Sequence, residues 1–400
     1  MTSVSHSAIR NSQSAIVCPA CESPSLRQFY EVDAIPTQSN LLMATRQQAV
    51  DQPRGDLKLA VCEACGFITN TAFDPATQEL SGKYEATQGH SPTFSAFAKK
   101  LAQRWVDRYQ LTGKKVLEIG CGQGEFISGL CDTANTPGIG IDPILSPDRK
   151  SDGRHVQFIS DYYGPKYRDL PADFIFCRHT LEHIQKPLEF LRTIRAAIGD
   201  NTKAVVAFEV PDTLRVLREC AFWDMYFEHC SYFVPETLQG VFERAGFEVL
   251  DQYREFDDQY LVIDVKPATP KPSPLAWDFQ SDIDRFKQNC STYLKLWQSR
   301  FDTWRARGAK VAIWGSGSKA VGFLTTLQIT DAMVPFVVDI NPNKHNTFLP
   351  GTAQKIVAPA AMTDYKPDVV IVMNPIYVPE ITVDLHVMNL QPAIEALTGA

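Results

Sequence analysis

Short apolar runs alternate with amphipathic segments through the middle of the chain, over residues 80–264. Apolar residues spaced three and four positions apart are typical of helices, and short β-branched or aromatic runs are typical of buried strands. The expected helices lie at residues 94–109 and 124–133, and the expected strands at 115–119, 138–141, 156–160, 173–177 and 204–210. Strands that alternate with helices in this way predict an α/β domain with a doubly wound, parallel sheet.

A second α/β pattern occupies residues 276–400, after a linker at residues 265–275 that contains four prolines. Apolar residues recur at helical spacing from Phe279 to Trp304, which predicts one long amphipathic helix that ends at Gly308. A Gly-rich turn follows the first of three strand-like runs, at residues 310–314, 334–339 and 368–373. This order of elements predicts a Rossmann-like C-terminal domain.

Two Cys-x-x-Cys pairs mark the N-terminal region, residues 12–75. Cys18 with Cys21, and Cys62 with Cys65, each place two thiolates on one tight turn. Four thiolates that leave no open coordination position are typical of structural zinc. The pairs lie farther apart than in compact zinc ribbons, so we expect a small sheet between them. Free thiols and a redox role are the alternatives.

The composition limits the classes of partner. The net charge is −7 and the pI is about 5.7, and we find no basic stripe of the kind that binds nucleic acid. No apolar run reaches the roughly 18–20 residues that a membrane span needs. The first eleven residues are polar and lack the apolar core of a secretory signal, and the six cysteines outside the pairs are scattered, as buried thiols are in a reducing compartment. We therefore expect a cytoplasmic protein with a small-molecule partner, and neither nucleic acid nor a membrane.

The strand at residues 115–119 runs into a turn that contains Gly120, Gly122 and Gly124. Glycines let the backbone turn sharply and approach a ligand closely, beside the amino end of the next helix. Glu118 lies just before the turn, where a carboxylate would repel a pyrophosphate but is suited to anchor an ammonium group. The pattern E-x-G-x-G-x-G resembles motif I of class I S-adenosylmethionine-dependent methyltransferases, with a nicotinamide cofactor as the alternative.

Three further strand ends indicate the same cofactor. Asp142 ends the next strand, about 20 residues on, as suits a carboxylate that accepts both ribose hydroxyls. Asp161 follows the strand at residues 156–160, where it is placed to meet the adenine amine. Cys177 and His179 end the fourth strand, where methyltransferases of this class usually cover the methionine moiety.

A loop after the fifth strand brings Tyr226, Glu228 and His229 together. Histidine has a pKa suited to accepting a proton near neutrality, so His229 is the candidate general base. Glu228 and Tyr226 are candidates to orient it or to bind substrate hydroxyls. His183 supplies a second imidazole after the fourth strand, and Tyr84 is a candidate to close the site from the N-terminal side. A structural polar role is the alternative for each of them taken singly.

The order of these features resembles the zinc-containing, S-adenosylmethionine-dependent sugar C-methyltransferases, from about residue 18 to about residue 381. Those enzymes methylate a carbon of a nucleotide-linked 4-keto-deoxysugar, as in the 3-C-methyltransferases of antibiotic sugar pathways. The resemblance implies a structural Zn²⁺, S-adenosylmethionine as the methyl donor and a histidine base at the position of His229. It also places Tyr226, Glu228, His183 and Tyr84 in the substrate pocket.

The resemblance further implies that the C-terminal domain helps to hold the nucleotide-sugar. Its recurring segments include Lys319, Lys344 and Asn374, which are therefore candidate substrate-binding residues. Lys319 stands at an expected helix start, where it is placed to meet a diphosphate. A purely structural role for this turn is the alternative.

The leading hypothesis is methylation of a carbon next to a carbonyl, because removal of the weakly acidic proton there gives an enolate. In O- or N-methylation of another small metabolite, the second hypothesis, His229 would deprotonate a hydroxyl. A nucleic-acid-modifying methyltransferase with a zinc recognition lobe, and a nicotinamide site at residues 315–319, are the remaining alternatives. Departures from the family pattern at residues 84–91 and 178–182 bear on which substrate is bound, and no pattern specifies an oligomeric state.

Overall fold

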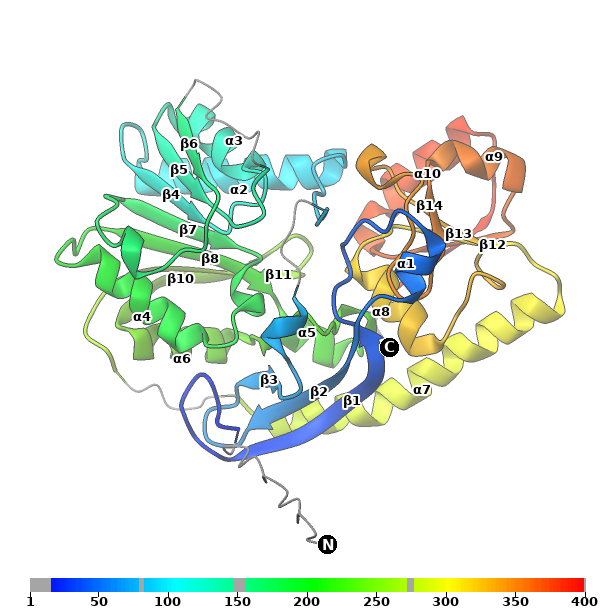
Figure 1. The fold of residues 1–400 in the computed structure, drawn as a ribbon, viewed down its shortest axis with the longest axis horizontal. Coiled ribbons are helices and arrows are strands. Elements are labelled where there is room, and N and C mark those ends of the chain that lie inside the picture. The colour runs from blue at the N-terminus through cyan, green and yellow to red at the C-terminus, as the bar shows by residue number, and fades with distance from the viewer. Residues whose placement is uncertain (1–15, 79–82, 147–154, 272–276, 399–400) are drawn as a thin grey trace, which may run out of the picture.

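The computed structural model describes residues 16–78, 83–146, 155–271 and 277–398. Its strands form a four-stranded, a seven-stranded and a five-stranded sheet. Figure 1 shows the seven-stranded sheet on the left, the five-stranded sheet on the right and the small N-terminal sheet below and between them. The two α/β domains that the sequence predicts therefore have two separate sheets, with the N-terminal sheet lying between them.

The central sheet has the strand order β10-β11-β8-β7-β4-β5-β6. All its neighbouring pairs are parallel except those of β11, which runs antiparallel to both β8 and β10. The bounds are β4 (Val116–Ile119), β5 (Gly138–Ile141), β6 (Val156–Ile159), β7 (Phe174–Arg178), β8 (Val205–Pro211), β10 (Phe247–Glu255) and β11 (Tyr260–Pro267). The doubly wound α/β fold is confirmed, and the sequence analysis missed the β10–β11 hairpin that completes it.

Helices cover both faces of this sheet. The apolar sides of α2 and α3 pack on one face, and those of α4 and α6 on the other. Each begins or ends at a residue suited to that position: Ser91 caps α2 by accepting a hydrogen bond from Phe94 N, and Gly246 ends α6 in the left-handed region. The bounds are α2 (Pro92–Tyr109), α3 (Glu125–Ala134), α4 (Pro187–Ile198), α5 (Thr213–Arg218) and α6 (Pro235–Ala245).

The N-terminal sheet is small, as expected, but it is not made by the N-terminal region alone. Its order is β1-β2-β3-β9, and β9 is a two-residue strand of the central domain. The bounds are β1 (Leu26–Pro36), β2 (Arg54–Cys62), β3 (Ile68–Asn70) and β9 (Ser231–Tyr232), with the short helix α1 (Arg46–Val50) between β1 and β2. The lobe expected to end at residue 75 is therefore completed by residues from the loop that contains His229.

The C-terminal domain begins with the long helix that the sequence predicts, α7 (Phe279–Ala306), which packs on β1 through Phe286. Its sheet is wholly parallel, in the order β14-β13-β12-β15-β16. The remaining bounds are β12 (Val311–Trp314), α8 (Ser318–Leu327), β13 (Phe336–Val338), β14 (Lys355–Val357), α9 (Met362–Tyr365), β15 (Val369–Val372), α10 (Val378–Val387) and β16 (Ala393–Ala396). The Rossmann-like prediction is confirmed for this half.

One boundary needs correction. Strand β11 continues to Pro267, so the first residues of the expected linker belong to the central sheet. Pro267 is tolerated there because the pairing of β11 with β8 ends at Val265, which leaves Pro267 with a neighbouring strand on one side only. Residues 272–276 of the expected linker lie outside the described residues.

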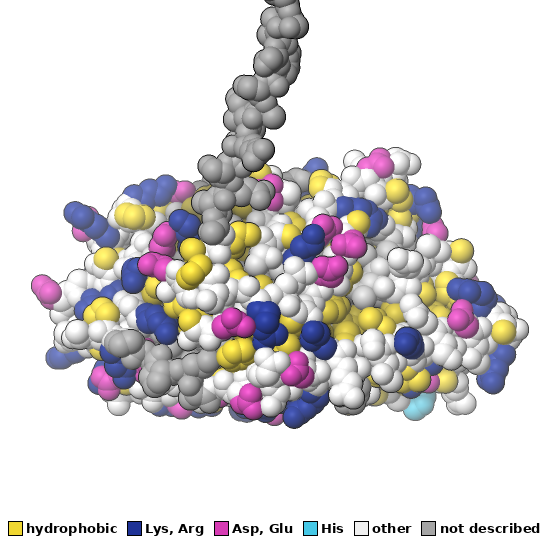
Figure 2. Space-filling model, turned by 90° about the horizontal axis from the view of Figure 1, so that it is seen from below, with side chains coloured by type: hydrophobic (Ala, Val, Ile, Leu, Met, Phe, Trp, Pro, Cys, Tyr) yellow, Lys and Arg dark blue, Asp and Glu magenta, His cyan; other side chains and the backbone are white. Residues whose placement is uncertain are grey.

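Two surface properties bear on the partners. None of the helices in the described ranges combines the length and the hydropathy of a membrane span. Figure 2 shows basic and acidic side chains interspersed on the face seen from below, with no stripe of one sign on that face.

Candidate active site

A cavity of about 1690 Å³ lies where the three parts of the chain meet. The carboxyl ends of β4, β5 and β7 supply one wall and the turn before α8 supplies another. Residues 84–91 of the connection into α2 also line it. Ligands of open α/β sheets bind at the carboxyl ends of the strands, so the cavity has the location expected for the active site.

The three glycines in the turn after β4 are not equivalent. All three have positive φ angles, +74° at Gly120, +56° at Gly122 and +84° at Gly124. A Cβ on Gly120 would lie 2.0 Å from Thr180 Oγ1, and one on Gly124 would lie 2.2 Å from the Phe158 ring. A Cβ on Gly122 would meet no atom within 4 Å. The outer two glycines are therefore needed for packing, whereas Gly122 opens onto the cavity.

Two buried carboxylates flank this turn. Asp142 accepts hydrogen bonds from Gly122 N and Ile144 N, both at 2.8 Å, which fixes its carboxylate at the cavity wall. Glu118 is 2% exposed, and its Oε2 has no hydrogen-bond partner among the described residues. Burial raises the pKa of Glu118 to about 8. An unpaired buried carboxylate is costly, so this wall is suited to a ligand that brings its own cation.

His179 lies in a buried charge network at the end of β7. Its Nε2 is 2.8 Å from Glu209 Oε1 and its Nδ1 is 3.4 Å from Glu182 Oε1. Arg178 also pairs with Glu209, at 2.7 Å. Burial alone would lower the pKa of His179, but the two neighbouring carboxylates raise it to about 9. His179 is therefore a cation at neutral pH, on the cavity wall as expected.

His229 and His183 face each other inside the cavity. Their ring centroids are 4.8 Å apart in an edge-to-face arrangement. Burial, followed by the charges of His183, His179 and Lys319, holds the pKa of His229 well below its ordinary value. Because its pKa is so low, His229 is neutral at pH 7 and able to take up a proton. A carbonyl oxygen only accepts, so the contact of 3.1 Å between His183 Nδ1 and the Glu228 carbonyl oxygen places the proton of the His183 ring on Nδ1.

Tyr226 and Glu228 surround His229 without hydrogen bonding to it. The Tyr226 ring packs edge-on against the His229 ring at 4.8 Å, and its hydroxyl donates to Asp224 Oδ1 at 2.6 Å. Glu228 accepts from both the backbone N and the hydroxyl of Ser39, and its Oε2 lies 3.4 Å from the Tyr84 hydroxyl.

Burial raises the pKa of both Tyr84 and Tyr226 well above its ordinary value, so both remain phenols and donors. The structure thus brings together all five residues that the sequence singled out as catalytic, and it adds Asp224 and Ser39. Neither addition lies in a recognisable motif.

The same cluster has the composition of a metal site. One ligand atom each from Glu182, His183 and His229 lies within 4.8 Å of the others, and Glu182 Oε2 has no hydrogen-bond partner among the described residues. Two histidines and one carboxylate with open positions are a common set for divalent metals. Because a ring nitrogen bound to a metal is not free to accept a proton, His229 cannot bind a metal and act as the general base at the same time.

The C-terminal domain contributes three of the expected residues, in three different ways. Lys319 Nζ lies 2.5 Å from both carboxylate oxygens of Asp224, so its charge is paired. Asn374 exchanges two hydrogen bonds, of 2.9 and 3.0 Å, with the amide of Gln259 in the central domain. Lys344, at the end of the 3-10 turn Pro342–Lys344, is only 6% exposed, and no partner of its ammonium group occurs in the described part of the chain. Of the three, Lys344 alone presents an unpaired charge to the cavity.

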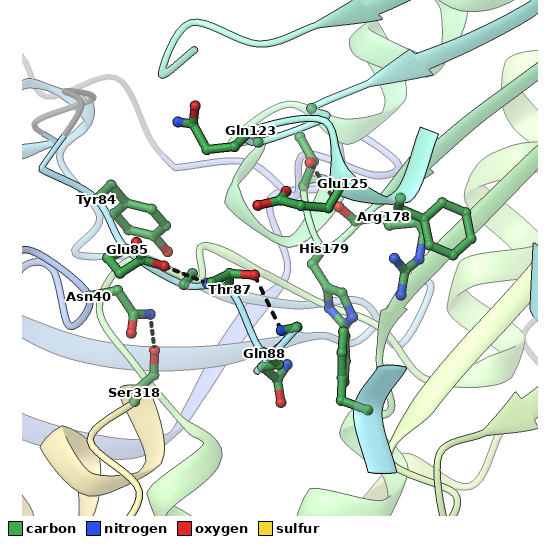
Figure 3. Close-up of a pocket in the computed structure, with 18 of the residues that line it drawn as sticks. Asn40, Tyr84, Glu85, Thr87, Gln88, Gln123, Glu125, Arg178, His179 and Ser318 are labelled. Atoms are coloured by element: carbon green, nitrogen blue, oxygen red, sulfur yellow. Dashed lines mark hydrogen bonds between the residues drawn. The ribbon is translucent and has the colours of Figure 1, made fainter. Parts of the chain in front are cut away.

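Residues 84–93 cross the cavity between the two large domains. Figure 3 shows Thr87 and Gln88 between Ser318 on the left and His179 on the right, with Tyr84 and Glu85 above Asn40 on the left. Side-chain hydrogen bonds to the C-terminal domain hold this segment, among them Glu85 with Asn341 (3.2 Å) and Asn343 (3.1 Å), Gln88 with Tyr377 (2.8 Å), and Thr93 with Glu380 (2.7 Å). The residues after Tyr84 therefore form part of the interface between the domains, which their sequence did not indicate.

The four paired cysteines meet at one point beside the N-terminal sheet. Their sulfurs all lie within 4.8 Å of one another, with Cys18 and Cys65 at 3.7 Å and Cys21 and Cys62 at 3.6 Å. Four sulfurs arranged tetrahedrally about 2.3 Å from a zinc ion lie about 3.8 Å apart. The donor set and its spacing therefore fit structural zinc.

Comparison with known proteins decides the class of enzyme. Residues 91–252 match a family model described as a methyltransferase domain, and residues 274–391 match a model described as a C-methyltransferase C-terminal domain. The chain is 23% identical over 386 residues to the C-methyltransferase NovU of Streptomyces niveus, which covers 91% of this chain and 90% of that protein. The protein is an S-adenosylmethionine-dependent methyltransferase. The segments that match these two family models thus lie on opposite sides of the active-site cavity.

Solved structures with similarity to this methyltransferase include the 1,6-didemethyltoxoflavin-N1-methyltransferase of Burkholderia thailandensis, with a TM-score of 0.35 and 14% identity over 50% of this chain and 96% of that one. Another is RosA of Streptomyces davawensis, an N,N-8-amino-8-demethyl-D-riboflavin dimethyltransferase, with a TM-score of 0.32 and 18% identity over 44% of this chain and 57% of that one.

The glycine turn of the methyltransferase is suited to its cofactor. Gly122 leaves open space, Glu118 offers an unpaired carboxylate oxygen, and Asp142 is fixed at the end of β5, where ribose hydroxyls are bound in this fold class.

Two expected cofactor residues need correction. Asp161 does not line the cavity, because its carboxylate is held by Lys166 and by the Tyr167 hydroxyl (2.5 Å), and this pairing lowers its pKa to about 2. Tyr162 and Tyr163, its neighbours, line the cavity instead. Cys177 is fully buried in the core of the sheet and does not line the cavity either. A position at a strand end predicts that a residue is near the cofactor. The contacts of its side chain within the protein decide whether that side chain reaches the cofactor.

Proposed function

We propose that this enzyme methylates a carbon next to a carbonyl in a nucleotide-linked keto-sugar. The observation that carries the proposal is the continuity of one cavity from Gly122 past His229 to Lys344. A cofactor, a reacting ring and a nucleotide are each several ångströms long, and a cavity of about 1690 Å³ exceeds the roughly 300–1,000 Å³ typical of single small-ligand sites.

His229 is the proposed general base. It takes the proton from the carbon beside the carbonyl, and the electron pair of that C–H bond delocalises onto the carbonyl oxygen as an enolate. Bound S-adenosylmethionine would supply an electrophilic sulfonium methyl to that carbon, with the electron pair of the broken S–CH3 bond left on S-adenosylhomocysteine. The buried, neutral state of His229 supports this role, because an imidazolium has no lone pair to accept the proton.

Tyr84 is the proposed donor to the enolate oxygen. Its hydroxyl makes a long contact of 3.4 Å with Glu228 and lies at the cavity, where it can donate to a substrate oxygen on which negative charge develops. Glu228 and Tyr226 then shape the pocket around the reacting ring, and His183 offers an acceptor nitrogen to a sugar hydroxyl.

Lys344 is the proposed ligand of the diphosphate. Its ammonium group lines the cavity without a partner in the described ranges, so it is free to form a charge-assisted hydrogen bond with a substrate anion. Lys319 and Asn374, the other expected substrate residues, are already paired within the protein. Zinc at Cys18, Cys21, Cys62 and Cys65 would be structural, because four thiolates leave no position for a substrate.

The test is a panel of nucleoside-diphosphate 4-keto-6-deoxysugars, incubated with S-adenosylmethionine, with NMR used to locate the transferred methyl. A methyl on carbon is expected, and one on oxygen or nitrogen would favour the second hypothesis. Exchange of the substrate α-proton into D₂O with S-adenosylhomocysteine bound reports the base step alone. His229→Ala should lower that exchange about 10²- to 10⁴-fold and leave cofactor binding intact. His386→Ala, an exposed histidine on α10, is the control, and normal exchange in His229→Ala would refute the base assignment.

A further inference from the structure

Helix α8 of the C-terminal domain packs directly on the 3-10 turn Phe222–Asp224 of the central domain. The rings of Phe222 and Phe323 stack with centroids 6.0 Å apart. A Cβ on Gly322 would lie 2.9 Å from the carbonyl oxygen of Trp223, so only glycine lets the helix come this close without a shift of backbone. The first turn of α8 is thereby held against the residues that lead into Tyr226.

Lys319, in that first turn, reaches the catalytic cluster through one carboxylate. Its Nζ is 2.5 Å from both oxygens of Asp224, and the Tyr226 hydroxyl donates to the same carboxylate at 2.6 Å. The Tyr226 ring in turn packs against His229 at 4.8 Å. Arg215 is 3.9 Å from Asp224, too far for a close pair, and is bound more closely to Glu219. Lys319 is therefore the cation that fixes the Asp224 carboxylate.

Ser318, the residue before it, reaches the other side of the cluster. Its hydroxyl oxygen lies 2.6 Å from Ser39 Oγ and accepts a hydrogen bond from Asn40 Nδ2 at 2.7 Å. Ser39 binds the carboxylate of Glu228, which also contacts Tyr84. Figure 3 shows the Asn40–Ser318 bond beside Tyr84 at the cavity.

We propose that Ser318 and Lys319 are positioning residues for the methyl transfer: the first turn of α8 holds Glu228 through Ser39, and Tyr226 through Asp224, around His229. The proposal rests on the catalytic role proposed above for His229 and its neighbours. Its consequence is that the C-terminal domain helps to assemble the reacting centre, besides holding the distal end of the substrate. Binding energy from the nucleotide end is then available to align groups at the reacting carbon.

The decisive variant is Lys319→Met, which keeps the length of the side chain and removes its charge. Lys355→Met, an exposed lysine of β14 in the same domain, is the matched control. Misplacement of a catalytic group by about 1 Å lowers a rate about 100-fold, so we expect kcat and α-proton exchange to fall about 10- to 100-fold in Lys319→Met. We expect KM for the nucleotide-sugar and the Kd for S-adenosylhomocysteine to stay within about threefold of wild type. Lys319→Arg, which keeps the charge, should recover most of the loss.

Two outcomes overturn the proposal. A raised KM with unchanged kcat in Lys319→Met would make Lys319 a substrate ligand, and unchanged kcat and KM with a lowered Tm would make the pair merely structural. Asp224→Asn should reproduce the loss of kcat, and the double variant should be no worse than either single one, because both act through one contact. Asp224→Asn also serves if Lys319→Met does not fold.

A crystal structure of Lys319→Met with S-adenosylhomocysteine gives a readout that needs no substrate. We expect Tyr226 to be displaced or to occupy more than one position, and an unchanged Tyr226 would refute the proposal. If wild-type enzyme turns over none of the nucleotide-sugars, the proposed function fails, and the position of Tyr226 still decides whether Lys319 positions it.

Discussion

Substituting Gly122 by alanine tests the cofactor site with a change of one methyl group. The Cβ would meet no protein atom within 4 Å, so the substitution causes no clash inside the protein. The backbone at Gly122 has φ +56°, and an L-residue with a side chain costs about 1–2 kcal/mol in the left-handed region. The new methyl would stand in the space beside Glu118 and Asp142 that the cofactor is expected to fill.

Two other glycines separate backbone strain from loss of the site. Gly308, exposed after α7, has φ +64° and also no atom within 4 Å of an added Cβ, so Gly308→Ala should lose the same 1–2 kcal/mol of unfolding free energy. Gly120→Ala adds a contact of 2.0 Å with Thr180, and overpacking of this kind costs about 1–3 kcal/mol more. The expected totals are therefore about 1–2 kcal/mol for Gly122→Ala and Gly308→Ala, and about 2–5 kcal/mol for Gly120→Ala.

The assays are denaturant unfolding and calorimetric titration with S-adenosylhomocysteine. We expect Gly122→Ala to weaken binding at least about tenfold, which is about 1.4 kcal/mol, while Gly308→Ala binds like wild type. Wild-type affinity in Gly122→Ala would refute the placement of the cofactor over this turn. Weakened binding in Gly308→Ala would show that backbone strain alone accounts for the effect.

Three further predictions concern protons and metal. Because the pKa of His229 lies well below its ordinary value of 6.5 and a base must be neutral, kcat/KM for the nucleotide-sugar, measured with S-adenosylmethionine saturating at every pH, should stay flat as the pH falls from 8 to 6.5 and decline only below that. A decline centred at or above 6.5 would contradict this. With a pKa of about 8, Glu118 is mostly protonated at pH 7, so binding of the cofactor's ammonium group should release close to one proton and cofactor affinity should rise with pH through 8. Calorimetry in two buffers of different ionisation enthalpy measures this proton release, which should be absent in Glu118→Gln. Elemental analysis should find one zinc ion per chain, and Cys62→Ser should remove it. A second metal equivalent that is lost in Glu182→Gln would instead assign a cation to the cluster of Glu182, His183 and His229, and would exclude His229 as the base.

Much of the secondary structure followed from local pattern. The strand expected at residues 138–141 has those bounds as β5, and the helix read from the spacing of Phe279 to Trp304 is α7. Such elements are predictable because burial on one side of a helix or strand imposes a period on nearby residues. The β10–β11 hairpin was missed, although each of its two strands is longer than most of the strands that were found.

The site was predictable to the extent that its residues sit in motifs. The glycine turn and the segment with Tyr226, Glu228 and His229 were found in the sequence, and the structure brings them to one cavity. Ser39 was missed because nothing in its neighbourhood distinguishes it from any polar loop residue. Its role depends on contacts with Glu228 and Ser318, which lie 189 and 279 residues away.

By itself, the sequence determined the class of each domain, the glycine turn and the identity of the groups able to do chemistry. Only the tertiary structure decided that β9 joins the N-terminal sheet, that Asp161 is held by Lys166, and that Lys319 is bound to Asp224 while Lys344 has no partner among the residues that the structure describes. The physical reason is that periodicity and turn formation depend on neighbours in the chain, whereas the partner of a charge depends on which surfaces pack together. In this enzyme the cavity forms where three such surfaces meet, and the packing of α8 on the turn before Tyr226 fixes the pairings within it.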